Sequence, residues 1–111
     1  YSNLAIRSLR GHGYTVIPVH PAHEEIEGIP VIPRLGLIRE HIDTLTVYIG
    51  PRNIIHLIDE IVALRPGRVI LNPGTESREL ELRLREADIA YLEACTLVML
   101  STGQFLDRIA S

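Results

Sequence analysis

The sequence predicts an α/β fold, a Rossmann-like three-layer domain with a mostly parallel sheet. Short apolar segments rich in Val, Ile, Tyr or Thr alternate with segments of helical periodicity, an order typical of βαβ units with right-handed crossovers. None of the apolar segments alternates apolar and polar residues, which favours strands covered on both faces. We expect strands at residues 14–19, 44–49, 68–71 and 89–92.

Helical patterns lie ahead of these strands and between them. We expect the first helix at residues 2–10, with Ser2 as its cap. Pro51 is tolerated at a first helical position and opens a helix over 51–64. Ser77 caps the next helix, and Asp88 ends it as a left-handed terminator.

Two segments are less regular. Residues 21–43 predict a loop with a short edge strand at 30–32 and one or two helical turns at 37–41. Residues 97–100 fit either a helical turn or an extended segment, and this alternative stays open.

The chain starts directly with a helix, whereas a strand normally precedes the first helix of such a sheet. A sheet with an empty central position would leave ladder hydrogen bonds unmade and apolar surface in water. We therefore expect a first strand and a phosphate loop ahead of Tyr1, so that residues 1–111 form a single domain that is incomplete at its N-terminus. A rearranged sheet is the alternative.

Composition excludes several classes of partner. A length of 111 residues fits one domain, and 46% hydrophobic residues suit a globular core. The 11 basic residues are scattered and the net charge is −3, so we expect no nucleic-acid partner. No apolar run is long enough for a membrane span. The single cysteine, Cys95, cannot form an internal disulfide, which fits a cytoplasmic protein.

The ends of the predicted strands carry the candidate ligand site. In open parallel sheets, ligands bind outside the carboxyl ends of the strands. The amino end of the first helix, at Tyr1-Ser2, points to the same edge and favours phosphate. The strand-end loops are His20-Pro21, Gly50-Pro51, Asn72-Pro73-Gly74 and Glu93-Ala94-Cys95.

His20 helps to choose among nucleotides. A dinucleotide-binding sheet usually has Asp or Glu at the end of its second strand, to accept hydrogen bonds from the adenosine ribose. Here His20 occupies that position, and Glu24 and Glu25 follow only later in the loop. The pattern favours a nucleotide ligand other than NAD, although a loop that returns one of these glutamates keeps NAD open.

Several segments together carry a family resemblance: GYTVIPVHP, EEIEGIPVIPRL, IDTLTVYIGP, NPGTES and EACTLVML. The chain resembles the small stand-alone CoA-binding proteins of bacteria, whose domain is similar to the CoA-binding domain of the succinyl-CoA ligase alpha chain. The resemblance covers nearly the whole chain. It implies a Rossmann fold that binds CoA or an acyl-CoA.

The resemblance also implies binding residues. The family motif VIPVNP matches residues 16–21, with His20 in place of asparagine, and Ala22 stands where a lysine often follows, which removes one cation near a phosphate. The predicted cofactor-binding residues are Tyr1, Ser2, Val19, His20, Pro21, Ile49, Gly50, Pro51, Asn72, Gly74 and Cys95.

No catalytic set or metal site is predicted. The sequence has no Gly-x-Ser-x-Gly elbow, no P-loop and no paired carboxylates at strand ends, and its histidines lack metal-ligand spacing. A ligand-binding domain is therefore favoured over an enzyme. The alternatives are an NAD(P)-binding or Cys95-dependent enzyme domain, and a homodimer that associates through residues 97–106.

Overall fold

The structure is a computed structural model that describes residues 2–20 and 24–105. The chain divides into two compact units. The first unit combines Tyr1–Arg34 with Thr96–Ser111, and the second unit is Leu35–Cys95.

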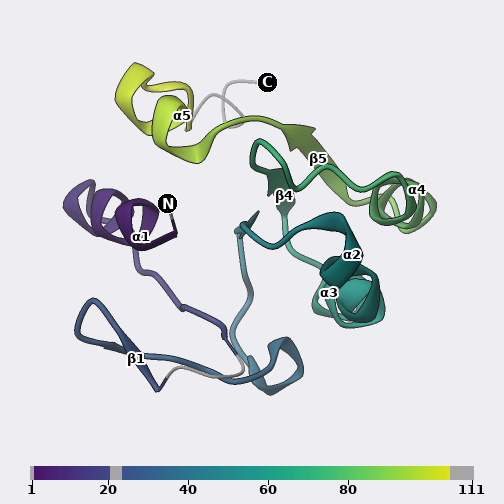
Figure 1. The fold of residues 1–111 in the computed structure, drawn as a ribbon, viewed down its shortest axis with the longest axis horizontal. Coiled ribbons are helices and arrows are strands. Elements are labelled where there is room, and N and C mark those ends of the chain that lie inside the picture. Colours follow the sequence, from purple (N-terminus) through teal and green to yellow (C-terminus); the bar gives the residue numbers. More distant parts are fainter. Residues whose placement is uncertain (1, 21–23, 106–111) are drawn as a thin grey trace. The chain divides into compact units, whose positions relative to one another are not determined.

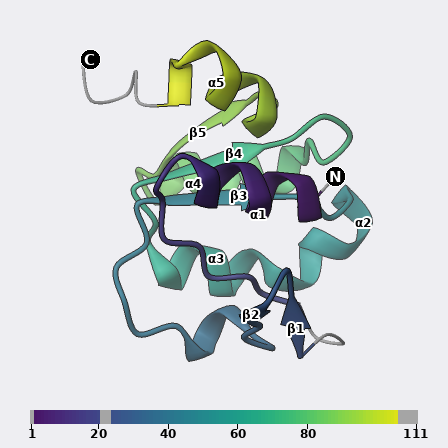
Figure 2. The same cartoon turned by 90° about the vertical axis from the view of Figure 1, so that its left-hand side faces the viewer.

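The second unit contains a three-stranded parallel sheet (Figure 2). Its strands are β3 (Thr44–Val47), β4 (Arg68–Leu71) and β5 (Ala90–Glu93), in the order β3-β4-β5. All four residues of β4 are buried, as the lack of alternation in the sequence predicts for a central parallel strand. The parallel α/β architecture is confirmed.

Helices of the second unit follow the expected periodicity. The helix predicted over residues 51–64 consists of α2 (Pro51–Ile54), a 3-10 turn η2 (Ile55–Leu57) and α3 (Ile58–Leu64). Helix α3 contacts α4 (Arg78–Glu86) (Figure 1). An ion pair joins the two helices, with Arg83 Nη2 2.9 Å from Asp59 Oδ1. The fully buried side chains include Ile54, Ile61, Leu80 and Leu84.

Both predicted ends of α4 are confirmed. The Leu80 N–H donates to Ser77 Oγ at 3.2 Å, so Ser77 is the N-cap. At the other end Asp88 has φ 58°, and the Ile89 N–H reaches back to the Leu84 carbonyl. Because Ile89 belongs to this helix-ending motif, β5 begins at Ala90 and not at residue 89.

The first unit contains helix α1 (Ser2–Gly11), a hairpin of β1 (Glu25–Ile26) with β2 (Ile29–Pro30), and helix α5 (Thr96–Thr102). Helices α1 and α5 pack against each other. The rings of Tyr14 and Phe105 lie beside them with centroids 5.0 Å apart. No helix among the described residues is long and apolar enough to cross a membrane.

The strand expected at residues 14–19 is largely wrong. Only Val19 pairs, in a parallel bridge with Ile32. Pro18 has no N–H to donate, which explains why a longer ladder does not form at this point. The edge strand expected at 30–32 is instead β2, which pairs antiparallel with β1.

Other boundaries also differ. The turns expected at 37–41 lie earlier, as the 3-10 helix η1 (Leu35–Leu37). The Gly36 N–H donates to Glu60 Oε1 of α3 at 3.1 Å, a tertiary bond that periodicity could not reveal. Strand β3 ends at Val47, two residues early. The open alternative at 97–100 is resolved as helix α5, whose Met99 and Leu100 are buried.

Candidate functional site

The carboxyl ends of β3, β4 and β5 form one edge of the sheet in the second unit. The register places Val47 beside Leu71, and Leu71 beside Glu93, so the three strands end at the same level. The structure therefore brings to this edge the predicted residues that follow the three strands. They are Ile49, Gly50, Pro51, Asn72, Gly74 and Cys95.

Asn72 closes the end of the central strand. Its side chain is 2% exposed, and Nδ2 donates to the Val47 carbonyl of β3 at 2.8 Å. The Asn72 carbonyl accepts hydrogen bonds from Thr75 Oγ1 at 2.7 Å and from the Thr75 N–H at 2.9 Å. The loop after β4 is thus fixed by hydrogen bonds that point into the protein.

Gly74 forms the outer part of the same loop. Its φ of 89° lies in the left-handed region, which explains the need for glycine. The Gly74 N–H donates to Glu76 Oε1 at 3.0 Å. This backbone amide therefore holds an anionic oxygen supplied by the chain itself.

The loop after β3 is built around Gly50 and Pro51. Gly50 is the N-cap of α2, and its carbonyl accepts from the Asn53 and Ile54 N–H groups. A Cβ added at Gly50 would meet no atom of the described residues within 4 Å, its two chain neighbours aside. The backbone at Gly50 is therefore open to close approach by a ligand.

The end of β5 is joined to β4 by a backbone hydrogen bond and is followed by a cysteine. The Ala94 N–H donates to the Leu71 carbonyl at 3.1 Å and ties this end to β4. Cys95 follows as a half-buried, free thiol. Its role as a ligand contact stays a prediction.

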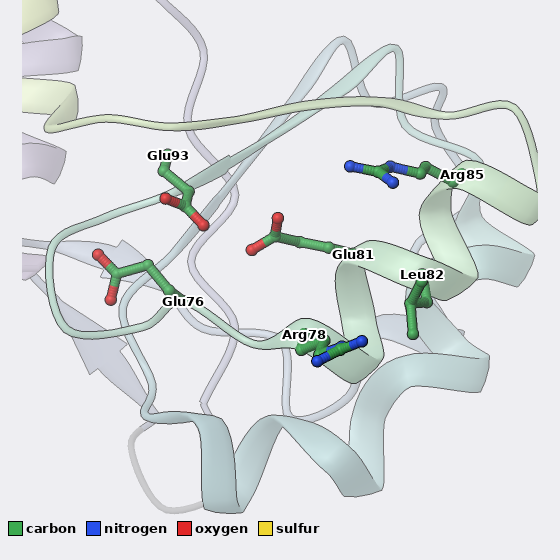
Figure 3. Close-up of a pocket in the computed structure, with 6 residues that line it drawn as sticks. All are labelled: Glu76, Arg78, Glu81, Leu82, Arg85 and Glu93. Atoms are coloured by element: carbon green, nitrogen blue, oxygen red, sulfur yellow. The ribbon is translucent and has the colours of Figure 1, made fainter.

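A hollow of about 390 Å³ lies beside the end of β5. Figure 3 shows Glu81 of α4 and Glu93 of β5 with their carboxylates directed toward each other, while the Glu76 carboxylate turns away. The hollow is lined by Glu76, Arg78, Glu81, Leu82, Arg85 and Glu93.

The carboxyl group of Glu81 has a raised pKa. Partial burial is the main cause, followed by a hydrogen bond with Glu93 and by the Glu93 charge. The positive charge of the nearby Arg85 guanidinium lowers the pKa of Glu81 and so offsets part of this increase. Arg85 is itself held on β5, because its Nε donates to the Tyr91 hydroxyl at 2.8 Å.

This carboxylate pair, which joins a helix residue, Glu81, to a strand-end residue, Glu93, was not predicted from the sequence. Glu93 ends a strand and meets Glu81 because the fold packs α4 against β5. Nothing in the local sequence signals this meeting, since the two residues belong to different elements. Among the described residues, no group of His, Cys, Asp and Glu side chains could hold a metal ion.

The remaining predicted site residues belong to the first unit. Ser2 is in the first turn of α1, and Val19 forms the bridge to Ile32. The His20 N–H donates to the Ile32 carbonyl at 3.1 Å, and the residue is half-buried. Tyr1 and Pro21 lie outside the described residues. A ligand contact by any of these residues stays a prediction.

Comparisons with known proteins bear on the family and the fold. The model of a CoA binding domain matches residues 1–101. An uncharacterized protein of known crystal structure is 45% identical, with a TM-score of 0.87 over 93% of this chain and 84% of that chain. A Thermus thermophilus protein is 33% identical, with a TM-score of 0.82 over 89% of this chain and 75% of that chain. No curated protein matches the sequence.

One further solved structure shares the fold alone. It is the dinucleotide forming acetyl-coenzyme A synthetase 1 of Candidatus Korarchaeum cryptofilum, solved in complex with phosphate and ADP. Its identity is 17% and its TM-score 0.68, over 81% of this chain and 22% of that chain.

Proposed function

The chain belongs to the CoA binding domain family, and from this membership we propose that it binds CoA or an acyl-CoA at the carboxyl edge of its parallel sheet. The observation that carries the proposal is the register of β3, β4 and β5, which aligns the Gly50 and Gly74 loops at one edge. Ligands of open parallel sheets bind at this edge. The proposed role is ligand binding, with no catalytic step assigned.

Electrostatics favours the β3 and β4 ends for the phosphates of CoA. The Gly74 amide can hold an anionic oxygen, here Glu76 Oε1, and a phosphate oxygen of the ligand would take the place of that carboxylate. The hollow beside β5 instead presents Glu81 and Glu93, which would repel an anion. We therefore propose that the charged part of the ligand lies over the Gly50 and Gly74 loops.

A glycine substitution tests the position of the ligand. Gly50→Ala adds a methyl group where it meets no protein atom within 4 Å, so the fold should tolerate it, at a cost of about 1 kcal/mol or less for the weaker N-cap. A ligand in close contact with this backbone would clash with the methyl group. Isothermal titration calorimetry on the full-length protein should show weaker CoA binding to Gly50→Ala.

The matched control is Gly11→Ala, at the carboxyl end of α1. A Cβ there also meets nothing within 4 Å, and no ligand contact is proposed for it, so its affinity for CoA should equal that of the wild type. Equal affinities for all three proteins would place the ligand elsewhere.

The ligand itself is tested by thermal unfolding. CoA at 100 times its Kd should add about 2.7 kcal/mol to the free energy of unfolding, because it binds only the folded chain. NAD at the same concentration should add little. A stabilisation by NAD without one by CoA would overturn the proposed function in favour of a dinucleotide-binding domain.

A further inference from the structure

Asn72 makes two hydrogen bonds to a single carbonyl across the sheet. Its side-chain Nδ2 lies 2.8 Å from the Val47 carbonyl oxygen, and its backbone nitrogen lies 3.4 Å from the same oxygen. Val47 is the last residue of β3. The loop toward Gly50 therefore leaves β3 at a point that Asn72 holds from the neighbouring strand.

The same residue also organises its own loop. Both the hydroxyl and the N–H of Thr75 donate to the Asn72 carbonyl. Thr75 is 5% exposed and Asn72 is 2% exposed, so these bonds are shielded from water. Buried hydrogen bonds of this kind restrict geometry, because breaking one leaves a polar group without water or a partner.

We propose that Asn72 is a positioning residue that fixes the Gly50 loop relative to the Gly74 loop, so that both backbones face the same ligand. The inference rests on the proposed function. It replaces the direct ligand contact predicted for Asn72 with an action through the backbone, because its amide nitrogen donates to Val47 and its side chain is buried. Preorganised loops lose less conformational entropy when a ligand binds.

The opposite end of the same two strands supplies a matched control. There Arg68 Nε of β4 donates to Thr44 Oγ1 of β3 at 2.9 Å, in a partly buried hydrogen bond. This bond also joins β3 to β4, but at the amino edge of the sheet. Thr44→Val removes it with almost no change of shape.

The experiment compares Asn72→Ala with Thr44→Val in the full-length protein. Amide resonances of Gly50 and Gly74 are followed by ¹H–¹⁵N NMR, and CoA affinity is measured by calorimetry. We expect Asn72→Ala to shift both glycine resonances and to weaken CoA binding on the order of tenfold, equivalent to one net hydrogen bond. Thr44→Val should lower Tm while both resonances and the CoA affinity stay as in the wild type.

The outcomes separate the inference from the proposed function. Unchanged CoA affinity in Asn72→Ala, or an equal loss in Thr44→Val, overturns the positioning role. If the wild type does not bind CoA, the proposed function is overturned. If the glycine resonances then still respond only to Asn72→Ala, the link between the two loops is retained. If Asn72→Ala does not fold, Asn72→Ser takes its place, because its hydroxyl is too short to reach Val47 and the same changes are expected.

Discussion

The ends of β4 and β5 are neighbours in one sheet, yet their chemistry differs. At the end of β4, Asn72 and Thr75 are buried, and the polar groups of Asn72 bond inward to Val47 and Thr75. The end of β5 is exposed and acidic, and the carboxylates of Glu93 and Glu81 are directed toward each other (Figure 3). Position in the sheet alone therefore does not decide what a strand end can bind.

The difference follows from the neighbours of each strand. In the described part of the second unit, β4 pairs on both sides, whereas β5 pairs with β4 alone. The end of this central strand can bury the Asn72 amide because the flanking strand β3 supplies the Val47 carbonyl as acceptor. The end of β5 remains in water, where a carboxylate keeps most of its hydration. We infer that the sheet offers a rigid backbone surface at its centre and a charged surface at its side.

The largest expected effect comes from leucine truncation at the two strands. Leu71 is fully buried in β4, so Leu71→Ala should lower the free energy of unfolding by about 2–5 kcal/mol. Leu92 of β5 is only half-buried, and Leu92→Ala should cost roughly half as much. Urea unfolding of both variants measures the contrast. Equal losses would mean that the two strands are equally covered.

The next effect concerns the helix between the two strands. Ser77→Ala removes the side-chain acceptor for the Leu80 N–H and should cost about 1 kcal/mol. The first turn of α4 should fray, which would loosen Arg78 and Glu81 in the wall of the hollow. Amide hydrogen exchange should quicken in this turn and stay slow at Thr75, whose N–H bonds to Asn72. Faster exchange at Thr75 as well would show that the two strand ends are not independent.

Local signals predicted much of the fold. The Ser77 cap, the left-handed Asp88 and the strand over residues 68–71 each depend on neighbouring residues, and all are confirmed. The strand predicted over residues 14–19 was wrong. The run of β-branched residues favoured a strand, but Pro18 has no N–H to donate to a ladder. The turn at Leu35–Leu37 depends on Glu60, which is distant in sequence. The strand and phosphate loop expected ahead of Tyr1 stay a prediction.

The site was predictable only in part. The rule that ligands bind at the carboxyl ends of parallel strands singled out the loops that contain Gly50, Asn72 and Gly74, and the strand register places these loops at one edge, while ligand binding by them stays a prediction. It could not show that the Asn72 side chain turns inward to Val47. Nor could it show that Glu81 meets Glu93, because that contact depends on the packing of α4 against β5. Buried hydrogen bonds and cross-element pairs are products of tertiary structure.

The sequence alone also could not show how much of the proposed homodimer interface is exposed. Residues 97–106 are apolar enough for a homodimer interface, but Met99, Leu100 and Phe105 are buried in the structure, and Val98 is 53% exposed. Leu106 lies outside the described residues. The homodimer stays a prediction, with a smaller apolar surface to support it than the sequence indicated.

The smallest expected effect is a pH dependence that belongs to the end of β5 alone. The pKa of Glu81 is raised above its ordinary value of 4.5 in the folded chain, by burial and by Glu93. The folded state therefore binds this proton more tightly than the unfolded state, and the free energy of unfolding should fall as pH rises from about 4.5 through the raised pKa. Glu81→Gln should remove this contribution and should be more stable than the wild type at pH 7, by less than about 0.5 kcal/mol because the group is only partly buried and solvent screens its charge.

The matched control for this prediction is Glu79→Gln. Glu79 shares the first turn of α4 with Glu81, so both substitutions remove one negative charge from the same end of the helix, but Glu79 does not line the hollow. The free energy of unfolding, measured with urea between pH 4 and 7, should change with pH as in the wild type for Glu79→Gln. For Glu81→Gln the slope of this free energy against pH should be flatter. Parallel slopes for the two variants would mean that the fold does not raise the pKa of Glu81, and the contrast between the strand ends would then be one of burial only.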